Sequence, residues 1–267
     1  MELLSAEFFQ RALIGGALIA ITAPLMGLFL VLRRLAMIGD TLAHVSIAGV
    51  ALGFLMNVYP VAIGLLFAIA ASFAIELLRR TYRTYAELSI AIIMSGGIAL
   101  ASLLFTMGKG FNLSVTSYLF GSIYTLTDTD IFVILGVTAI VLSMVLIHKK
   151  ELFLLTFDED AAAVSGLPLK YFNIMLSILT ALVISAAIKI VGALLVSALL
   201  TIPAACSLAL SRSFKQAVIL VVVIGEAAVL AGLWIAGVAN LAPGGTIVLL
   251  LIAVLAVSVA STKLIRT

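Results

Sequence analysis

Residues 39–53 read GDTLAHVSIAGVALG and lie inside a hydrophobic segment that is long enough to cross a membrane. This segment nevertheless carries Asp40 and His44. Residues four apart lie on one face of a helix, so the two side chains are expected to be neighbours. Ionisable groups inside a bilayer are costly, and by default they mark a substrate or proton path. A carboxylate and an imidazole are also good ligands for divalent metals. The pair therefore indicates either an ion path or a structural hydrogen bond between helices.

The composition of the whole chain predicts a membrane protein. Of its 267 residues, 64% are hydrophobic and 10% are charged, whereas a soluble domain carries about 25% charged residues. No basic run with interleaved aromatic residues is present, which argues against nucleic-acid binding. Cys206 is the single cysteine, so no disulfide can form within the chain. The N-terminal residues lack the basic region of a cleaved signal peptide.

Nine hydrophobic segments approach the length of about 20 residues that a helical span requires. They cover approximately residues 11–32, 36–56, 60–78, 88–107, 129–147, 171–188, 190–210, 217–237 and 245–262. The sixth and seventh segments are the least clearly divided, so eight spans is the second choice. We therefore expect an all-α, polytopic helical bundle that forms a single transmembrane domain over residues 1–267.

The basic residues predict how this bundle is oriented, because cytoplasmic loops carry an excess of Lys and Arg. Three basic residues fall on one side, namely Arg11, Lys109 and Lys189. Twelve fall on the other side, namely Arg33, Arg34, Arg79, Arg80, Arg83, Lys149, Lys150, Lys170, Arg212, Lys215, Lys263 and Arg266. The second side is expected to be cytoplasmic, which puts the N-terminus outside and the C-terminus inside.

The outer side of the bundle contains two further features. Asp128 and Asp130 lie near the outer end of the fifth segment, and we expect both to be solvated. The stretch SYLFGSI, residues 117–123, either lines the outer mouth of a path or anchors the chain at the membrane interface.

A second acid is expected at the same depth as His44. His44 lies ten residues beyond Arg34, and Glu226 lies ten beyond Gln216, the start of the eighth segment. Ten residues climb about 15 Å along a helix, or half of a hydrocarbon core of about 30 Å. Glu226 is the one charged residue of its segment, and a lone carboxylate there needs a partner, a proton or an ion. We expect Glu226 to be either a third metal ligand or a protonated structural acid.

The longest cytoplasmic connection, residues 148–170, predicts a short helix over about residues 156–166. Thr156 and Glu159 have the spacing of a capping box. Residues 158–160 are all acidic and would lie in the first turn, where the helix dipole favours negative charge. Gly166 suits a left-handed residue that ends a helix. The acidic turn disfavours a helix resting on an anionic leaflet, so we expect a docking element for a cytoplasmic partner.

These residues resemble a known family. Asp160-Ala161-Ala162-x-x-x-Gly166 is similar to the E-A-A-x-x-x-G coupling motif of bacterial ABC importer permeases, with Asp in place of Glu. Four stretches together resemble the permease subunits of zinc and manganese ABC importers. They are LRRLAMIGDTLAHVSIAGVALG (residues 32–53), SYLFGSI (117–123), LLTFDEDAAAVSGL (154–167) and IVGALLVSALLTIPAA (190–205).

The resemblance implies a fold similar to that of cobalamin and siderophore permeases. It implies that Asp40 and His44 meet the metal, and that an ATPase subunit docks on the short cytoplasmic helix. The residues expected to couple to that ATPase are Asp158, Glu159, Asp160, Ala161, Ala162 and Gly166. The implied partners are a second permease copy in a homodimer, two cytoplasmic ATPase subunits and a metal-binding protein outside the membrane.

The sequence therefore predicts the permease of an ATP-driven importer of zinc or manganese, with the metal as transported substrate and no permanently bound cofactor. The chain contains no G-x-x-x-x-G-K-[ST] motif, so ATP hydrolysis is expected on a separate subunit. The alternative is an ion- or proton-coupled carrier with Asp40, His44 and Glu226 as a relay, which leaves the cytoplasmic helix unexplained. An intramembrane metalloenzyme ranks third, because H-E-x-x-H is absent. Carboxylates and imidazoles do not choose among Zn²⁺, Mn²⁺ and Fe²⁺.

Overall fold

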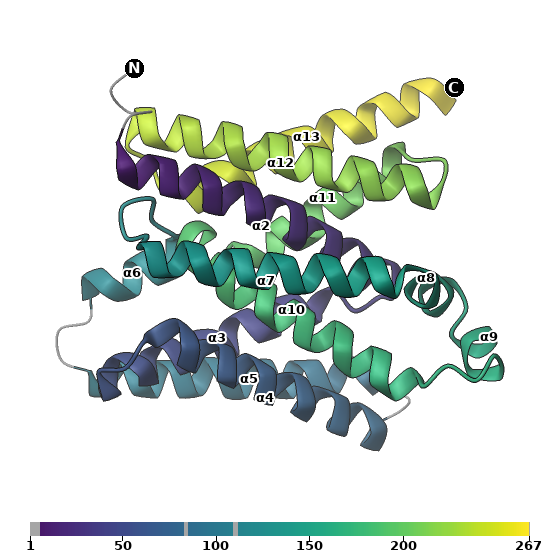
Figure 1. The fold of residues 1–267 in the computed structure, drawn as a ribbon, viewed down its shortest axis with the longest axis horizontal. Coiled ribbons are helices and arrows are strands. Elements are labelled where there is room, and N and C mark those ends of the chain that lie inside the picture. Colours follow the sequence, from purple (N-terminus) through teal and green to yellow (C-terminus); the bar gives the residue numbers. More distant parts are fainter. Residues whose placement is uncertain (1–5, 83–84, 109–111, 267) are drawn as a thin grey trace.

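The computed structural model describes residues 6–82, 85–108 and 112–266. These residues form twelve helices and no strand (Figure 1), which confirms the all-α prediction. The helices are α2 (Glu7–Leu32), α3 (Ala36–Met56), α4 (Pro60–Thr81), α5 (Ala86–Met107), α6 (Asn112–Phe120), α7 (Asp128–Ile147), α8 (Lys149–Phe157), α9 (Glu159–Val164), α10 (Leu169–Val191), α11 (Val196–Leu210), α12 (Phe214–Ala239) and α13 (Pro243–Arg266). Arg83 and Lys109, which the orientation argument uses, lie outside the described residues.

Eight helices in the described part of the chain are long and apolar enough to cross a membrane. The seventh predicted segment is the exception. It begins in the last turn of α10, is interrupted at residues 192–195, and continues as α11, which has 15 residues. A helix of that length spans about 23 Å, less than the hydrocarbon core of about 30 Å. Of the nine predicted segments, eight form full-length helices among the described residues, which was the second choice of the prediction, and the seventh forms the shorter helix α11.

The helices form a bundle in which α2, α3 and α10 are the most buried of the long helices, and α7 crosses the middle of the view in Figure 1. On one side α3, α4 and α5 lie together, and on the other α12 and α13 accompany α2 and α11. The short helices α8 and α9 lie at one end of the bundle, and α6 lies at the other end (Figure 1). The two termini also lie at opposite ends.

Glycines set the closest helix contacts. A Cβ on Gly49 of α3 would lie 2.6 Å from the carbonyl oxygen of Ile63 on α4. A Cβ on Gly97 of α5 would lie 2.6 Å from Val45 Cγ2 on α3, whereas one on Gly96 would meet nothing within 4 Å. Helices in lipid associate through such small residues, because apolar side chains gain little by leaving the lipid tails. The helix α3 is thus clamped between α4 and α5.

We predict that Gly27→Ala destabilises the bundle. A Cβ at Gly27 of α2 would lie 1.8 Å from the carbonyl oxygen of Leu200 on α11, so the two backbones would have to separate. Overpacking of this kind costs about 1–3 kcal/mol or more, and the melting temperature of the purified protein in detergent should fall.

Gly96→Ala is the matched control for that experiment. Its Cβ enters open space, and alanine is a better helix former than glycine by about 0.5–1 kcal/mol. Its melting temperature should therefore stay the same or rise slightly. Equal melting temperatures for the two variants would contradict the close contact between α2 and α11.

Candidate functional site

The helix α3 carries Asp40 and His44 on one face, as their spacing predicts. The two residues lie in an uninterrupted helix from Ala36 to Met56. His44 Nε2 lies 3.8 Å from Asp40 Oδ1, and the side chains are 20% and 34% exposed, respectively. The pair is therefore partly accessible, although most of its helix is buried. Binding of a metal ion by these two groups remains a prediction.

The surroundings of the pair fix its helix in place. Gly39, next to Asp40, faces Leu200 of α11 so closely that a Cβ would lie 2.9 Å from Leu200 Cδ1. Two residues beyond His44, the hydroxyl of Ser46 lies 3.4 Å from the hydroxyl of Ser185 on α10. A site held by a clamped helix keeps its geometry better than a site on a loop.

Glu226 does not join the pair to form a three-ligand site within one chain. It is half-buried on α12, where the adjacent Gly225 lies against Pro24 of α2. The residues that the structure describes contain no group of three or more His, Cys, Asp or Glu that could hold a metal. The reason is the packing: α2 and α11 contact both α3 and α12, and so lie between the two helices that carry the candidate ligands. A metal role for Glu226 remains a prediction.

Asp130 forms a buried ion pair, so the expectation that it is solvated is wrong. Lys189 Nζ of α10 lies 2.8 Å from both carboxylate oxygens of Asp130, and the two side chains are 12% and 4% exposed. Asp130 also accepts hydrogen bonds from Thr127 N, at 2.8 Å, and from the hydroxyl of Tyr59. Thr127 and Asp130 form a capping box at the start of α7, and this turns the carboxylate inward.

Asp128 behaves as expected, since its side chain is 71% exposed and pairs with Arg11 at 2.7 Å. The T-x-x-D spacing at residues 127–130 was a sequence signal for the start of α7, although it does not indicate that Asp130 is buried.

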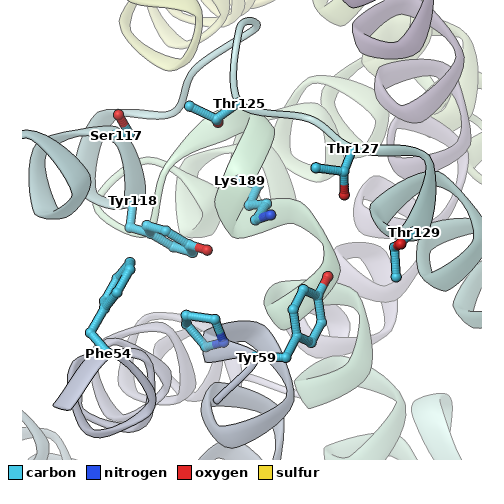
Figure 2. A pocket seen from close by; sticks show the side chains of 9 residues that line it. Phe54, Tyr59, Ser117, Tyr118, Thr125, Thr127, Thr129 and Lys189 are labelled. Atoms are coloured by element: carbon cyan, nitrogen blue, oxygen red, sulfur yellow. The ribbon is translucent and has the colours of Figure 1, made fainter. Parts of the chain in front are cut away.

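A pocket of 660 Å³ opens beside the buried ion pair, at the end of the bundle where α6 lies. Aromatic rings and hydroxyl groups line it, together with the Lys189 ammonium (Figure 2). Its lining residues are Phe54, Tyr59, Pro60, Ser117, Tyr118, Thr125, Thr127, Thr129 and Lys189. Burial raises the pKa of Tyr59 and of Tyr118, and Asp130 raises both further. Both phenols are therefore neutral: Tyr59 donates its hydroxyl proton to Asp130, and Tyr118 keeps a donor for the pocket.

The SYLFGSI stretch lines this pocket and is tied to the break after α10. Ala193 N donates to Tyr118 O at 2.9 Å, and Ser122 N donates to Lys189 O at 2.9 Å. Gly121 and Gly192 both have positive φ, of 80° and 87°. A Cβ on Gly192 would lie 2.4 Å from the carbonyl oxygen of Leu119, so this crossing requires glycine. Two motifs 70 residues apart thus form one structural unit.

The short helix predicted within residues 148–170 is present as α9, but its start differs from the prediction. Thr156 belongs to α8, and its hydroxyl donates to Leu152 O at 2.6 Å instead of capping the next helix. Asp158 is the N-cap of α9 and accepts from Ala161 N at 2.8 Å. The predicted capping box is therefore wrong, because an aspartate one residue before Glu159 makes the cap.

The end of α9 agrees with the prediction. Gly166 has a φ of 81°. Its N–H donates to Ala163 O at 3.0 Å, and Leu167 N donates to Ala162 O at 3.1 Å. These two bonds form a Schellman motif. Ala162 is fully buried, whereas Val164 is 90% exposed, so α9 has one face against the protein and one face free of it.

Comparison with known proteins identifies the family, since the model of the ABC 3 transport family matches residues 5–262. The chain belongs to this family. It is 31% identical to the probable metal transport system membrane protein of Treponema pallidum, over 99% of both chains. It is 31% identical to the manganese import system permease protein ScaB of Streptococcus gordonii, over 91% of this chain and 87% of ScaB.

Two solved structures are similar as well. PsaBC from Streptococcus pneumoniae in complex with Fab matches with a TM-score of 0.85 and 31% identity, over 96% of this chain and 92% of the matched one. An inward-facing structure of a putative metal-chelate type ABC transporter matches with a TM-score of 0.75 and 17% identity, over 94% and 85%. The second likeness shows the fold alone.

We predict that Lys189→Met strongly destabilises the protein. It leaves the Asp130 carboxylate buried without its cation, and breaking a buried ion pair on one side costs about 3–5 kcal/mol. The melting temperature in detergent should fall well below that of Lys150→Met, which removes the same charge from an exposed position. Equal stability of the two variants would contradict the burial of the pair.

Proposed function

We propose that this chain is the membrane-spanning subunit of an ATP-driven importer for divalent metal ions, and that manganese is the first ion to test. The observation that carries the proposal is the partly accessible Asp40–His44 pair, fixed on a clamped helix of an ABC transport family member. The family relatives include proteins named for manganese and for metal transport. Zinc stays an expectation of the sequence resemblance.

The chemistry of the pair suits an ion in passage. An ionised carboxylate and a neutral imidazole each offer a lone pair to a cation. One chain supplies two such groups, so two copies around a shared path would supply two carboxylates and two imidazoles. Carboxylate oxygen suits Mn²⁺, and imidazole suits several transition metals. An ion that keeps water in its remaining positions can also leave again, which a transport site requires.

The helix α9 is proposed as the docking element for a separate ATPase subunit. Its buried face carries Ala162, and its free face carries Val164, whose 90% exposure is unusual for an apolar residue. An apolar side chain at the tip of a short, well-capped helix is suited to enter a pocket of a partner. This arrangement favours an ATP-driven importer over a proton-coupled carrier, which has no use for such a helix. The end that carries α9 would then be cytoplasmic, and a metal-binding protein would deliver at the other end.

We predict that Asp40→Asn and His44→Ala each reduce ATP-dependent uptake of Mn²⁺ at least tenfold. Asp40→Asn removes the negative charge of one proposed ligand and His44→Ala removes the other ligand, and a tenfold loss corresponds to about 1.4 kcal/mol. Radioactive manganese uptake into cells that express the permease with its neighbouring ATPase and binding protein measures this effect.

Glu87→Gln is the control for uptake, since it removes an exposed acid at the start of α5. All variants are compared at equal amounts of permease in the membrane. Normal uptake by either site variant would remove that residue from the path.

We predict that Val164→Lys weakens binding of the ATPase subunit at least tenfold, or about 1.4 kcal/mol. Lysine suits the C-terminal end of a helix, so α9 should stay folded while its apolar contact is lost. The fraction of ATPase that copurifies with tagged permease measures the effect. Val164→Thr keeps the shape of the side chain and should copurify more than the lysine variant. Equal copurification of both variants with wild type would argue against docking at Val164.

A further inference from the structure

A buried arginine joins α9 to the end of α2. Arg33 is the C-cap residue of α2, and its Nη2 lies 3.5 Å from Oε1 of Glu159, the first residue of α9. The Arg33 side chain is 5% exposed, whereas that of Glu159 is 52% exposed. The cation is therefore fixed within the protein, and the carboxylate reaches it from the rim.

Glu159 opposes the effect of burying Arg33. Burial lowers the pKa of Arg33, and the Glu159 carboxylate opposes that shift. Arg33 Nη1 is buried without a hydrogen-bond partner. Two further charges act on Arg33: Arg79 repels it and Glu76 attracts it, and these two lie 3.7 Å apart. Of the charges that favour the Arg33 cation, the Glu159 carboxylate contributes most.

Arg33 also stands directly before the helix of the candidate metal pair. Residues 33–35 form the turn between α2 and α3, and Leu35 N donates to Leu30 O across it at 2.8 Å. The helix α3 begins at Ala36, and Asp40 lies in its second turn. The main contacts of α9 are with α8 and α10. The Arg33–Glu159 pair gives α9 a direct side-chain connection to the start of α3.

We propose that Arg33 is a positioning residue, which transmits movement of α9 to the α2–α3 turn, and so to Asp40 and His44, through its ion pair with Glu159. The inference rests on the proposed function, because α9 is moved only when an ATPase subunit acts on it. Without the pair, the ATPase would still dock and hydrolyse ATP, but less of its movement would reach α3.

The test is the number of Mn²⁺ ions transported per ATP hydrolysed, measured on the whole permease–ATPase complex in proteoliposomes with binding protein. Arg33→Gln and Glu159→Gln should each lower this ratio about fivefold or more, the lower end of typical couplings between sites. ATP hydrolysis per complex should persist. Because both changes break one link, the double variant should be no worse than the more severe single variant. Arg33→Lys keeps the charge and should recover part of the ratio.

Arg34→Gln is the matched control, since it removes the same charge from the exposed neighbouring residue of the same turn, and its ratio should equal that of wild type. Glu159 is half exposed, so Glu159→Gln should assemble even if Arg33→Gln does not. A wild-type number of Mn²⁺ ions per ATP in Glu159→Gln would overturn the proposed role of the Arg33–Glu159 pair. Losses of this ratio that add up in the double variant would do the same. Either result would leave the proposed function of the chain in place. A wild-type complex that takes up no metal would overturn the proposed function and this inference with it.

Discussion

A backbone inside a membrane must find hydrogen-bond partners within the protein, and this constraint shapes one end of the fold. Lipid offers no donor or acceptor, so non-helical backbone is tolerated there only where protein covers it. The chain breaks its helical pattern at residues 192–195, between α10 and α11. The exposed groups of this break are satisfied by residues 118–122, through bonds such as Ala193 N to Tyr118 O at 2.9 Å. Gly121 and Gly192 allow the two backbone segments to contact each other.

This junction organises one end of the molecule. It holds Tyr118 at the wall of the pocket and Lys189 one turn before the break, where the ammonium meets Asp130. The ion pair fastens α10 to α7, and the Tyr59 hydroxyl adds the start of α4 to the same network. Three helices and one connection thus meet at a buried charge pair, which is expensive unless each polar atom finds a partner.

The other end of the molecule uses a looser arrangement. The Arg33–Glu159 pair is longer, at 3.5 Å, and one of its members is half exposed. The helix α9 has six residues and one buried side chain. An element with little buried surface can move at low cost. The helix α10 connects the two ends of the molecule, because it runs from Leu169 beside α9 to Lys189 at the buried ion pair.

Local signals in the sequence determined most of the helices of this protein. Hydrophobic length predicts the spans, because a bilayer demands about 20 apolar residues whatever their neighbours are. The spacing of Asp40 and His44 determined that they share a face, since the period of a helix is fixed. Gly166 determined where α9 ends, because its left-handed backbone is a local property.

Only the tertiary structure decided which distant groups meet. The burial of Asp130 depends on Lys189, 59 residues later, and the separation of Glu226 from Asp40 depends on which helices lie between α3 and α12. The sequence did not show that α11 is short. The break at residues 192–195 is apolar and is covered by another loop, so its composition is the same as that of a membrane-spanning helix. The sequence marks Arg33 only as one of the basic residues that predict orientation, and Glu159 only as an acid of the short helix. The two residues come into contact only because α2 and α9 pack near each other, and local sequence patterns do not determine this packing.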